Sequence, residues 1–185
     1  MTISQGDSTA ITVGLATSAD LDDLWGLLDD AARWMTERGI DQWPDPFPRD
    51  LLAGSVHRQE TYTARQADQL VGTIALYRED ERFWGHRPPD ALYVHRLCVA
   101  RDRAGRGLGA VLLEWAGRQA HAQRRSWLRL DTGAGNTKLR SFYENLGFIH
   151  QGDICVHIPS AGRFDRPWNA ALYQRPVSAR TGVGP

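Results

Sequence analysis

A glycine-rich segment is the part of the sequence best suited to binding a ligand. Residues 101–110 read Arg-Asp-Arg-Ala-Gly-Arg-Gly-Leu-Gly-Ala. Glycine leaves the backbone N–H groups uncovered, and a helix that begins in such a loop adds the positive end of its dipole. The segment therefore predicts a site for the pyrophosphate of a bound molecule.

The elements around this loop follow from hydrophobic spacing. An apolar strand is expected over 91–99, before the loop, and an amphipathic helix over 109–123, after it. Strands are also expected at 11–15, 61–65, 70–76, 127–130, 148–158 and 170–175. Further helices are expected from Ser18 or Asp20 to 37, near 49–58 and at 137–146, with loops at 40–48 and 78–90. This order predicts an α+β domain with a mixed sheet and helices on both of its faces.

Length and composition favour one domain. The chain has 185 residues, of which 42% are hydrophobic and 24% charged, enough to form a single buried core. We expect a flexible leader at 1–10, a single domain at 11–177 and a flexible tail at 178–185. Basic and acidic residues number 22 each, so no overall charge attracts the chain to nucleic acid or an anionic membrane.

The cysteines and the first residues bear on the compartment. Cys98 and Cys155 both fall in apolar strand-like segments, which favours buried thiols over a disulfide. The first ten residues hold no Lys or Arg, and no stretch of about 18 apolar residues occurs. These features predict a cytoplasmic protein that is not embedded in a membrane.

The glycine loop has two interpretations, and the first is a dinucleotide-binding unit. Gly105-x-Gly107-x-x-Ala110 fits that fingerprint, and Asp131 ends the next expected strand, where a ribose-binding acid would stand. However, five residues separate Val99 from Gly105, whereas the fingerprint turns directly from strand to helix. The unit also follows an expected hairpin, and only about 55 residues remain after Asp131. The dinucleotide interpretation is therefore disfavoured.

The second interpretation comes from several motifs in order. Leu97-Cys98-Val99, the run from Arg103 to Gly109, Asn136, and the run Phe142-Tyr143-Glu144-Asn-Leu-Gly147-Phe148 resemble the motifs of the GNAT superfamily of N-acetyltransferases. The resemblance covers about residues 93–148. It implies the fold of that family, a twisted and mostly antiparallel sheet of about seven strands with helices on both faces.

The resemblance also implies a cofactor and its binding residues. In that family the loop amides bind the pyrophosphate of acetyl-CoA, the acyl donor, and no metal is implied. The implied cofactor-binding residues here are Leu97, Cys98, Val99, Arg103, Ala104, Gly105, Arg106, Gly107, Leu108, Gly109, Ala110, Asn136 and Tyr143, and Arg101 also lies within reach of the phosphates. Ala104 departs from the Gln or Arg that is usual at the start of this loop. Asn136 is equally suited to capping the helix that begins at Thr137.

Acetyl transfer needs an uncharged amine, a polarised thioester carbonyl and a proton for the leaving thiolate. The resemblance assigns polarisation to backbone N–H groups of the strand ending at Val99, opened by a bulge. It assigns Tyr143 as the partner of the coenzyme A sulfur; the alternative is a core aromatic. His95 stands where many relatives carry a Glu and is the candidate base; the alternative is a histidine packed on the sheet. Asp131 and Glu144 are further carboxylate candidates.

The acceptor site is expected to be aromatic and acidic. Trp34, Trp43 and Trp84 lie in segments that resemble the acceptor side of the fold, together with His95. Nearby are Phe47 and the carboxylates of Asp41, Asp45, Glu79, Asp80 and Glu81. Such a set could bind a cationic amine, although lid-packing tryptophans and solvated acids are the alternative.

Together these observations predict an acyltransferase that moves an acetyl group from acetyl-CoA to a primary amine of a small molecule in a ternary complex. The alternatives are another acyl donor, such as a longer acyl-CoA or aminoacyl-tRNA, and a non-catalytic coenzyme A sensor. The sequence leaves a homodimer open. No metal is expected, because His150, Cys155 and His157 lack a fourth ligand.

Overall fold

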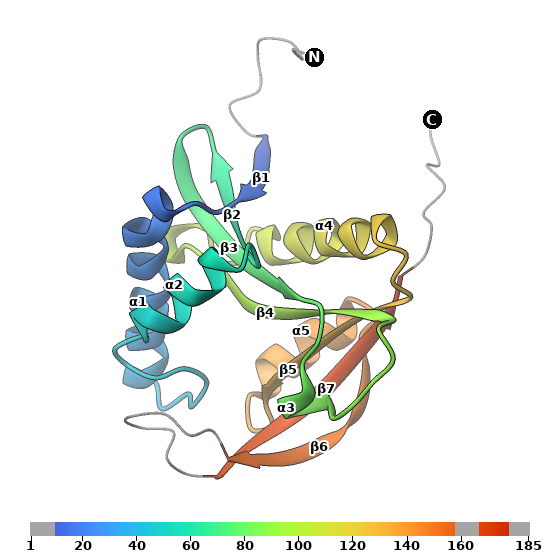
Figure 1. Ribbon diagram of the computed structural model, residues 1–185. Coiled ribbons are helices and arrows are strands. Elements are labelled where there is room, and N and C mark those ends of the chain that lie inside the picture. Colours follow the sequence, from blue (N-terminus) through green and yellow to red (C-terminus); the bar gives the residue numbers. More distant parts are fainter. Residues whose placement is uncertain (1–9, 158–166, 178–185) are drawn as a thin grey trace.

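The computed structural model describes residues 10–157 and 167–177. The tail expected at 178–185 and nearly all of the leader expected at 1–10 therefore lie outside the described residues. The remainder is built on one sheet with helices packed on it (Figure 1). Among these residues, no helix is both long and apolar enough to cross a bilayer.

Seven strands form the sheet, in the order β1-β2-β3-β4-β5-β7-β6. Their bounds are β1 (Ile11–Leu15), β2 (Thr61–Gln66), β3 (Gln69–Tyr77), β4 (Ala91–Val99), β5 (Trp127–Gly133), β6 (Ile149–His157) and β7 (Pro167–Pro176). Every neighbouring pair is antiparallel except β4 and β5, which are parallel. The mixed, mostly antiparallel sheet of the α+β prediction is confirmed.

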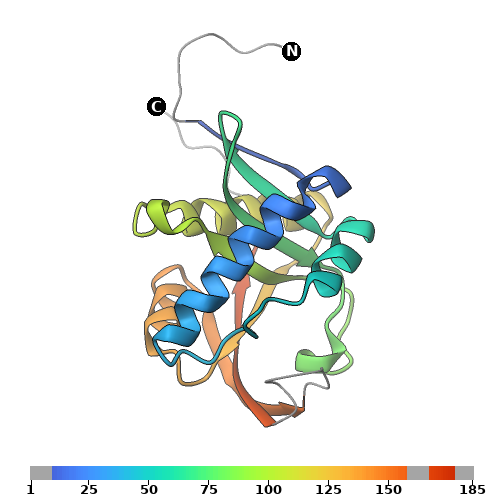
Figure 2. The same ribbon diagram turned by 90° about the vertical axis from the view of Figure 1, so that its left-hand side faces the viewer.

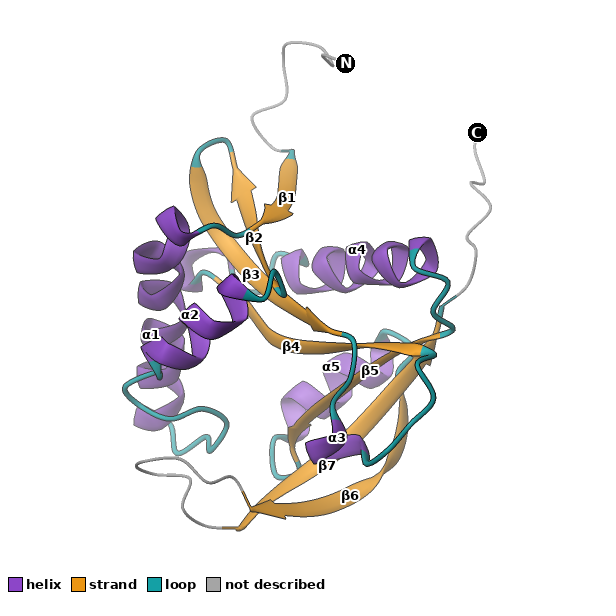
Figure 3. Cartoon of the chain, in the orientation of Figure 1, coloured by secondary structure: helices purple, strands orange, loops and turns teal. Residues whose placement is uncertain are grey.

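Helices cover both faces, as predicted (Figures 2 and 3). They are α1 (Leu21–Glu37), α2 (Arg49–His57), α3 (Glu81–Trp84), α4 (Leu108–Ala122) and α5 (Thr137–Asn145), with short 3-10 turns η1 (Ser18–Asp20) and η2 (Arg101–Arg103). The largest core packs α4 and α5 against one face. On the other face, α1 and α2 cover the half of the sheet nearer β1, and α3 packs near β6 and β7.

Among the differences from the prediction, two concern α3 and the end of β5. The sequence indicated a loop throughout 78–90, but α3 forms there, because Trp84 is buried against Ala91, Tyr93 and Leu172. The β5 strand continues beyond Leu130 to Gly133, because its last residues pair with β7. In both cases contacts with distant strands fix a conformation that local sequence does not indicate.

The two central strands separate part-way along their length. Paired positions of β4 and β5 end at Val94 and Leu130, although both strands continue. The register between β3 and β4 shifts at the same level, and Arg96 has a φ of +46°. This irregularity is the predicted bulge, and it bends β4 away from β5. We call the place where the backbones of the two parallel strands separate, toward their carboxyl ends, the opening between β4 and β5.

The two cysteines have different environments, and the prediction is right for only one. Cys98 is buried against α1, and burial raises the pKa of its thiol to about 12. Cys155 is exposed, which corrects the expectation of a buried thiol. It lies on the edge strand β6, where alternate residues face solvent while Val156 faces the core.

Candidate functional site

The glycine loop leads from η2 into α4 with the expected geometry. Gly105 and Gly107 have φ of +76° and +80°, a left-handed conformation that disfavours any residue with a Cβ. Helix α4 begins at Leu108, one residue before the predicted start. The first N–H groups of an α-helix have no acceptor within the helix, so Leu108, Gly109 and Ala110 offer amides to an anion.

The arginines near this loop have different partners. Arg103 donates to Gln66 and Gln69 at the β2–β3 turn, at 2.7 and 3.0 Å, so its side chain ties the loop to that hairpin. The Arg101 guanidinium lies 3.6 Å from the ring centroid of Trp34. Arg106 and Ala104 are exposed on the loop.

Helix α5 carries the two other candidate residues for the cofactor. Asn136 caps it by accepting a hydrogen bond from the Leu139 N–H at 3.2 Å, which confirms the capping alternative. The Tyr143 ring is buried beside Phe148 and Tyr173. Burial raises the pKa of Tyr143, and the nearby carboxylate of Asp131 raises it further, so the phenol keeps its proton throughout the neutral range.

A histidine between two carboxylates lies at the opening between β4 and β5. His95 Nε2 is 3.1 Å from Asp80 Oδ2, and His95 Nδ1 is 3.9 Å from Asp131 Oδ1. The exposed fractions of the side chains are 17% for His95, 9% for Asp80 and 10% for Asp131. The imidazole ring also packs on Tyr77, at 4.4 Å between centroids, and Phe83 lies at 6.4 Å. We call Asp80, His95 and Asp131 the acid–histidine cluster.

Sequence reasoning missed the central part of this arrangement. His95 and Asp131 were candidates, but Asp80 was grouped with the loop acids and Tyr77 and Phe83 were not considered. The segment of Asp80 and Phe83 has no periodicity that would place it on the sheet. Parallel pairing of β4 with β5 would have indicated that His95 and Asp131 lie level with each other.

The three tryptophans expected in the acceptor site make their ring contacts with residues other than His95. Trp34 is stacked by Arg101 and by Arg38, the latter at 4.5 Å. Trp43 packs edge-on against the buried Phe47, at 5.6 Å between centroids. Trp84 is buried in a core cluster with Tyr93. The aromatic rings that contact His95 are those of Tyr77 and Phe83 instead.

The loop that joins α1 to α2 borders the same region. The Gln42 side-chain oxygen accepts from the Gly133 N–H at 3.0 Å and from the Thr132 hydroxyl at 3.2 Å. The Trp168 indole N–H donates to the Asp41 carbonyl oxygen at 3.2 Å. A Cβ at Gly133 would lie 3.2 Å from that same carbonyl oxygen. These contacts hold the loop over the end of β5, next to Asp131.

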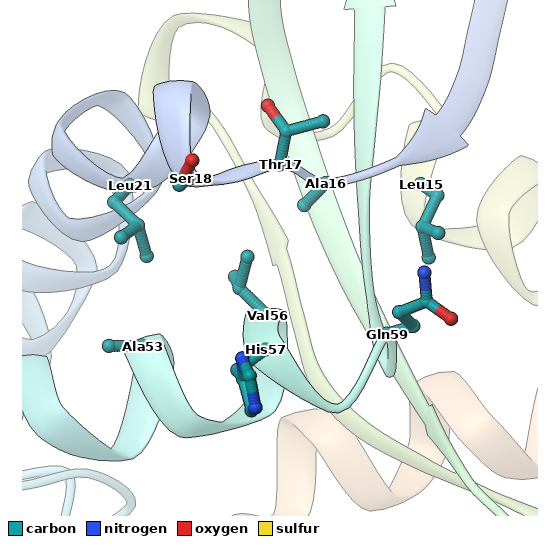
Figure 4. Close-up of a pocket in the computed structure, with 9 residues that line it drawn as sticks. All are labelled: Leu15, Ala16, Thr17, Ser18, Leu21, Ala53, Val56, His57 and Gln59. Atoms are coloured by element: carbon teal, nitrogen blue, oxygen red, sulfur yellow. The ribbon is translucent and has the colours of Figure 1, made fainter.

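A cavity of the structure lies away from this site. It measures about 490 Å³ and lies between α2 and the segment from Leu15 to Leu21 (Figure 4). Apolar and polar side chains both line it, and His57 is the ionisable side chain among them. The acid–histidine cluster contributes nothing to it, so the cavity is unconnected with acid–base chemistry at His95.

Burial of Asp131 has a measurable consequence for stability. Burial raises the pKa of its carboxyl from 3.8 to about 6, which corresponds to about 3 kcal/mol. As the pH rises, the Asp131 carboxyl ionises at a lower pH in the unfolded state than in the native state. Its ionisation therefore lowers the free energy of unfolding progressively from about pH 4, and by the full amount only above about pH 6. Asp131→Asn is therefore expected to raise the free energy of unfolding by about 2 kcal/mol more at pH 8 than at pH 4.5, because about 1 kcal/mol of the penalty is already present at pH 4.5.

Urea unfolding at a series of pH values measures this effect. Asp68→Asn, at an exposed position in the β2–β3 turn, is the matched control and is expected to show no such trend. A stability difference between Asp131→Asn and the unmodified protein that stays constant between pH 4.5 and pH 8 would contradict the raised carboxyl pKa.

Comparison with known proteins gives the family of this chain. The sequence model of the Acetyltransferase (GNAT) family matches residues 26–148. The chain belongs to the GNAT family of acetyltransferases. A curated relative, the uncharacterized N-acetyltransferase YesJ of Bacillus subtilis, is 31% identical over 145 residues, which cover 74% of this chain and 81% of the relative. This GNAT chain is accordingly an acyltransferase, as predicted.

Solved structures share the GNAT fold. A GNAT-family acetyltransferase from Listeria monocytogenes superposes with a TM-score of 0.72 at 24% identity, covering 90% of this chain and 94% of its own. The protein yncA from Salmonella typhimurium, solved with its cofactor acetyl-CoA, has a TM-score of 0.67 at 13% identity, covering 95% and 99%. At these identities the likeness concerns the fold, and the predicted fold is confirmed.

Proposed function

We propose that this GNAT protein transfers the acetyl group of acetyl-CoA to a primary amine of a small molecule, by direct attack in a ternary complex. The observation that carries the proposal is the acid–histidine cluster at the opening between β4 and β5. A base at this place would face a thioester bound between the separated strands. We also propose a cytoplasmic location, because both cysteines are free.

The donor is proposed to bind along the bulged strand and the glycine loop. Backbone N–H groups of Leu97, Cys98 and Val99 would pair with the pantetheine arm and polarise the thioester carbonyl. Amides from Ala104 to Ala110 would hold the pyrophosphate, and the acetyl-CoA of the similarly folded yncA supports this donor. Arg106 is exposed and would supply the phosphate contact that Ala104 lacks. Asn136 would border the pantetheine while it caps α5.

The amine must lose a proton before it attacks. We propose His95 as the group that accepts this proton, directly or through one water. Asp80 acts as a positioning residue, because its carboxylate is 3.1 Å from Nε2 and buried with the ring. Asp131, near the other ring nitrogen, would stabilise the ammonium form of the acceptor as it arrives.

The leaving thiolate needs stabilisation, and Tyr143 is proposed to provide it. A thiol ordinarily titrates near 8.5, well below a phenol. Because burial and Asp131 raise the pKa of Tyr143, the phenol would donate a hydrogen bond to the thiolate and keep its proton. Solvent or the released ammonium proton then completes the formation of coenzyme A.

The surroundings of His95 favour a small cationic acceptor. Two carboxylates attract an ammonium group, and the rings of Tyr77 and Phe83 offer faces to a cation or to its alkyl chain. Trp34, Trp43 and Trp84 support the neighbouring segments and do not contact His95 through any ring pair of the described residues. We therefore propose that Tyr77 and Phe83 line the acceptor site beside His95, the proposed general base.

Calorimetry and a thiol-release assay test this proposal together. Acetyl-CoA and coenzyme A are expected to bind, and an amine panel is expected to contain an acceptor that releases thiol. Gly107→Ala, at a φ of +80°, is expected to weaken acetyl-CoA binding, whereas Gly26→Ala, in a helix with free space around it, is not. Binding without turnover on any amine would favour a sensor. No binding of acetyl-CoA would favour another acyl donor and overturn the proposal.

A further inference from the structure

The acid–histidine cluster has the composition of a metal site as well as of a base. It unites three elements that are distant in the sequence: the segment before α3, the bulged part of β4 and the end of β5. One ligand atom from each of Asp80, His95 and Asp131 lies within 4.8 Å of the other two. We infer that these three side chains bind a divalent cation of the zinc type, and that this cation competes with the amine acceptor.

The contact between His95 and Asp80 resembles a pair of metal ligands more closely than it resembles a hydrogen bond. Nε2 and Oδ2 are 3.1 Å apart, yet neither atom has a hydrogen-bond partner within the part of the chain that the structure describes, and both are buried. Two ligands that are each about 2.0–2.2 Å from one metal ion lie about 3.0–3.5 Å from each other. The spacing of these two atoms therefore suits adjacent ligands of one metal ion.

The charge of the cluster also favours a cation. Within residues 10–157 and 167–177, His95 is the ion-pair partner found for both Asp80 and Asp131. The nearest guanidinium on β4, that of Arg96, is directed elsewhere: it donates to the Ser55 hydroxyl and lies 5.4 Å from the Tyr77 ring centroid. Two buried carboxylates against one imidazole leave an excess of negative charge, which is costly without a counter-ion.

The ligand types select the class of ion. One imidazole nitrogen and two carboxylate oxygens suit Zn²⁺ or Co²⁺, and three protein ligands leave a coordination position open. Calcium is less suited, because it takes six to eight oxygen ligands. Asp131 lies 3.9 Å from the ring at Nδ1, so it is the ligand that must approach when the ion binds.

Competition with the amine follows from shared groups, and this part of the inference rests on the proposed function. A bound ion would occupy the imidazole lone pair that accepts the proton of the amine. It would also neutralise the carboxylates that attract the ammonium group. Zinc is therefore expected to act as a reversible inhibitor that competes with the amine and does not compete with acetyl-CoA.

Metal titration of the untagged protein tests the site without using activity. Co²⁺ is expected to bind with visible absorption of a low-symmetry complex, and Zn²⁺ is expected to displace it. Asp80→Asn keeps the side-chain shape and is expected to weaken Co²⁺ binding at least tenfold. His95→Gln is a second variant with the same expected loss, and circular dichroism reports whether either variant is folded.

A matched control is available on β6. His150 Nε2 and Asp153 Oδ1 are 2.7 Å apart in an exposed pair without a third ligand within reach among the described residues. His150→Ala is expected to leave Co²⁺ binding unchanged. The proposed metal site would be overturned if His150→Ala lost affinity for Co²⁺. It would also be overturned if Asp80→Asn and His95→Gln were both folded and bound Co²⁺ with unchanged affinity.

Inhibition kinetics then test the competition. A rise in apparent KM for the amine with added Zn²⁺, at constant kcat, supports it. Binding of Co²⁺ at the cluster without any such effect on an active enzyme overturns the competition. A protein that binds Co²⁺ at the cluster but acetylates no amine would contradict the proposed function and support the metal site, so the two failures are distinguishable.

Discussion

Replacement of His95 by glutamine is expected to lower kcat by about 10²- to 10⁴-fold, the usual contribution of a positioned general base. Glutamine fills much of the same space between Asp80 and Asp131, at a side chain that is 17% exposed, so the fold is expected to persist. It cannot accept a proton at neutral pH. The loss should therefore appear in kcat with the amine saturating, while the affinity for acetyl-CoA changes little.

The pH–rate profile distinguishes the proposed base from a packing role. The unmodified enzyme is expected to lose activity at low pH, because a base that already carries a proton cannot accept one from the amine. In His95→Gln that acidic limb is expected to shift or disappear. His57→Gln, in α2 and beside the remote cavity, is the matched control. A variant profile identical in shape and height to the native one would exclude His95 as the base.

Replacement of Tyr143 by phenylalanine is expected to lower kcat by about 10- to 100-fold, the value of one hydrogen bond to a charged group. The ring stays packed against Phe148 and Tyr173, since only the hydroxyl is removed. Stability and acetyl-CoA affinity are therefore expected to change little. Single-turnover thiol release and calorimetry with acetyl-CoA measure the two quantities separately.

Tyr173→Phe provides the control for Tyr143→Phe in the same core. The Tyr173 hydroxyl donates to Glu144 at 2.7 Å and accepts from Arg140 at 3.0 Å. Its removal is expected to lower stability by about 1–3 kcal/mol, because the two charged partners lose a bond, and to leave kcat largely unchanged. Native turnover in Tyr143→Phe would eliminate the proposed role in stabilising the thiolate.

The sequence by itself determined the architecture of this GNAT domain. Hydrophobic periodicity identified the strands and the long helices, because each buries one face against a common core. The positions of Gly105 and Gly107 identified the loop, since only a residue without a Cβ readily adopts φ near +80°. Motif order from Leu97 to Phe148 identified the family. Such features are local, and a local pattern is readable without the fold.

Other features depended on contacts between distant segments. Helix α3 is four residues long, too short for a periodic pattern, and it forms because Trp84 is buried against strands that follow it in the chain. Cys155 has the apolar neighbours of a core residue but faces solvent on an edge strand. The aromatic acceptor residues predicted from their segments were three tryptophans, whereas the rings beside His95 belong to Tyr77 and Phe83.

The acid–histidine cluster is the clearest case of what only the tertiary structure decided. The glycine loop, the bulged strand and Tyr143 were readable from the sequence, because motif spacing fixes them. Asp80, His95 and Asp131 have no fixed spacing from one another. They meet because β4 and β5 pair in parallel and then separate, while a non-periodic segment brings a buried carboxylate to the imidazole. Their convergence is a property of strand register and side-chain burial, which no single segment of the sequence encodes.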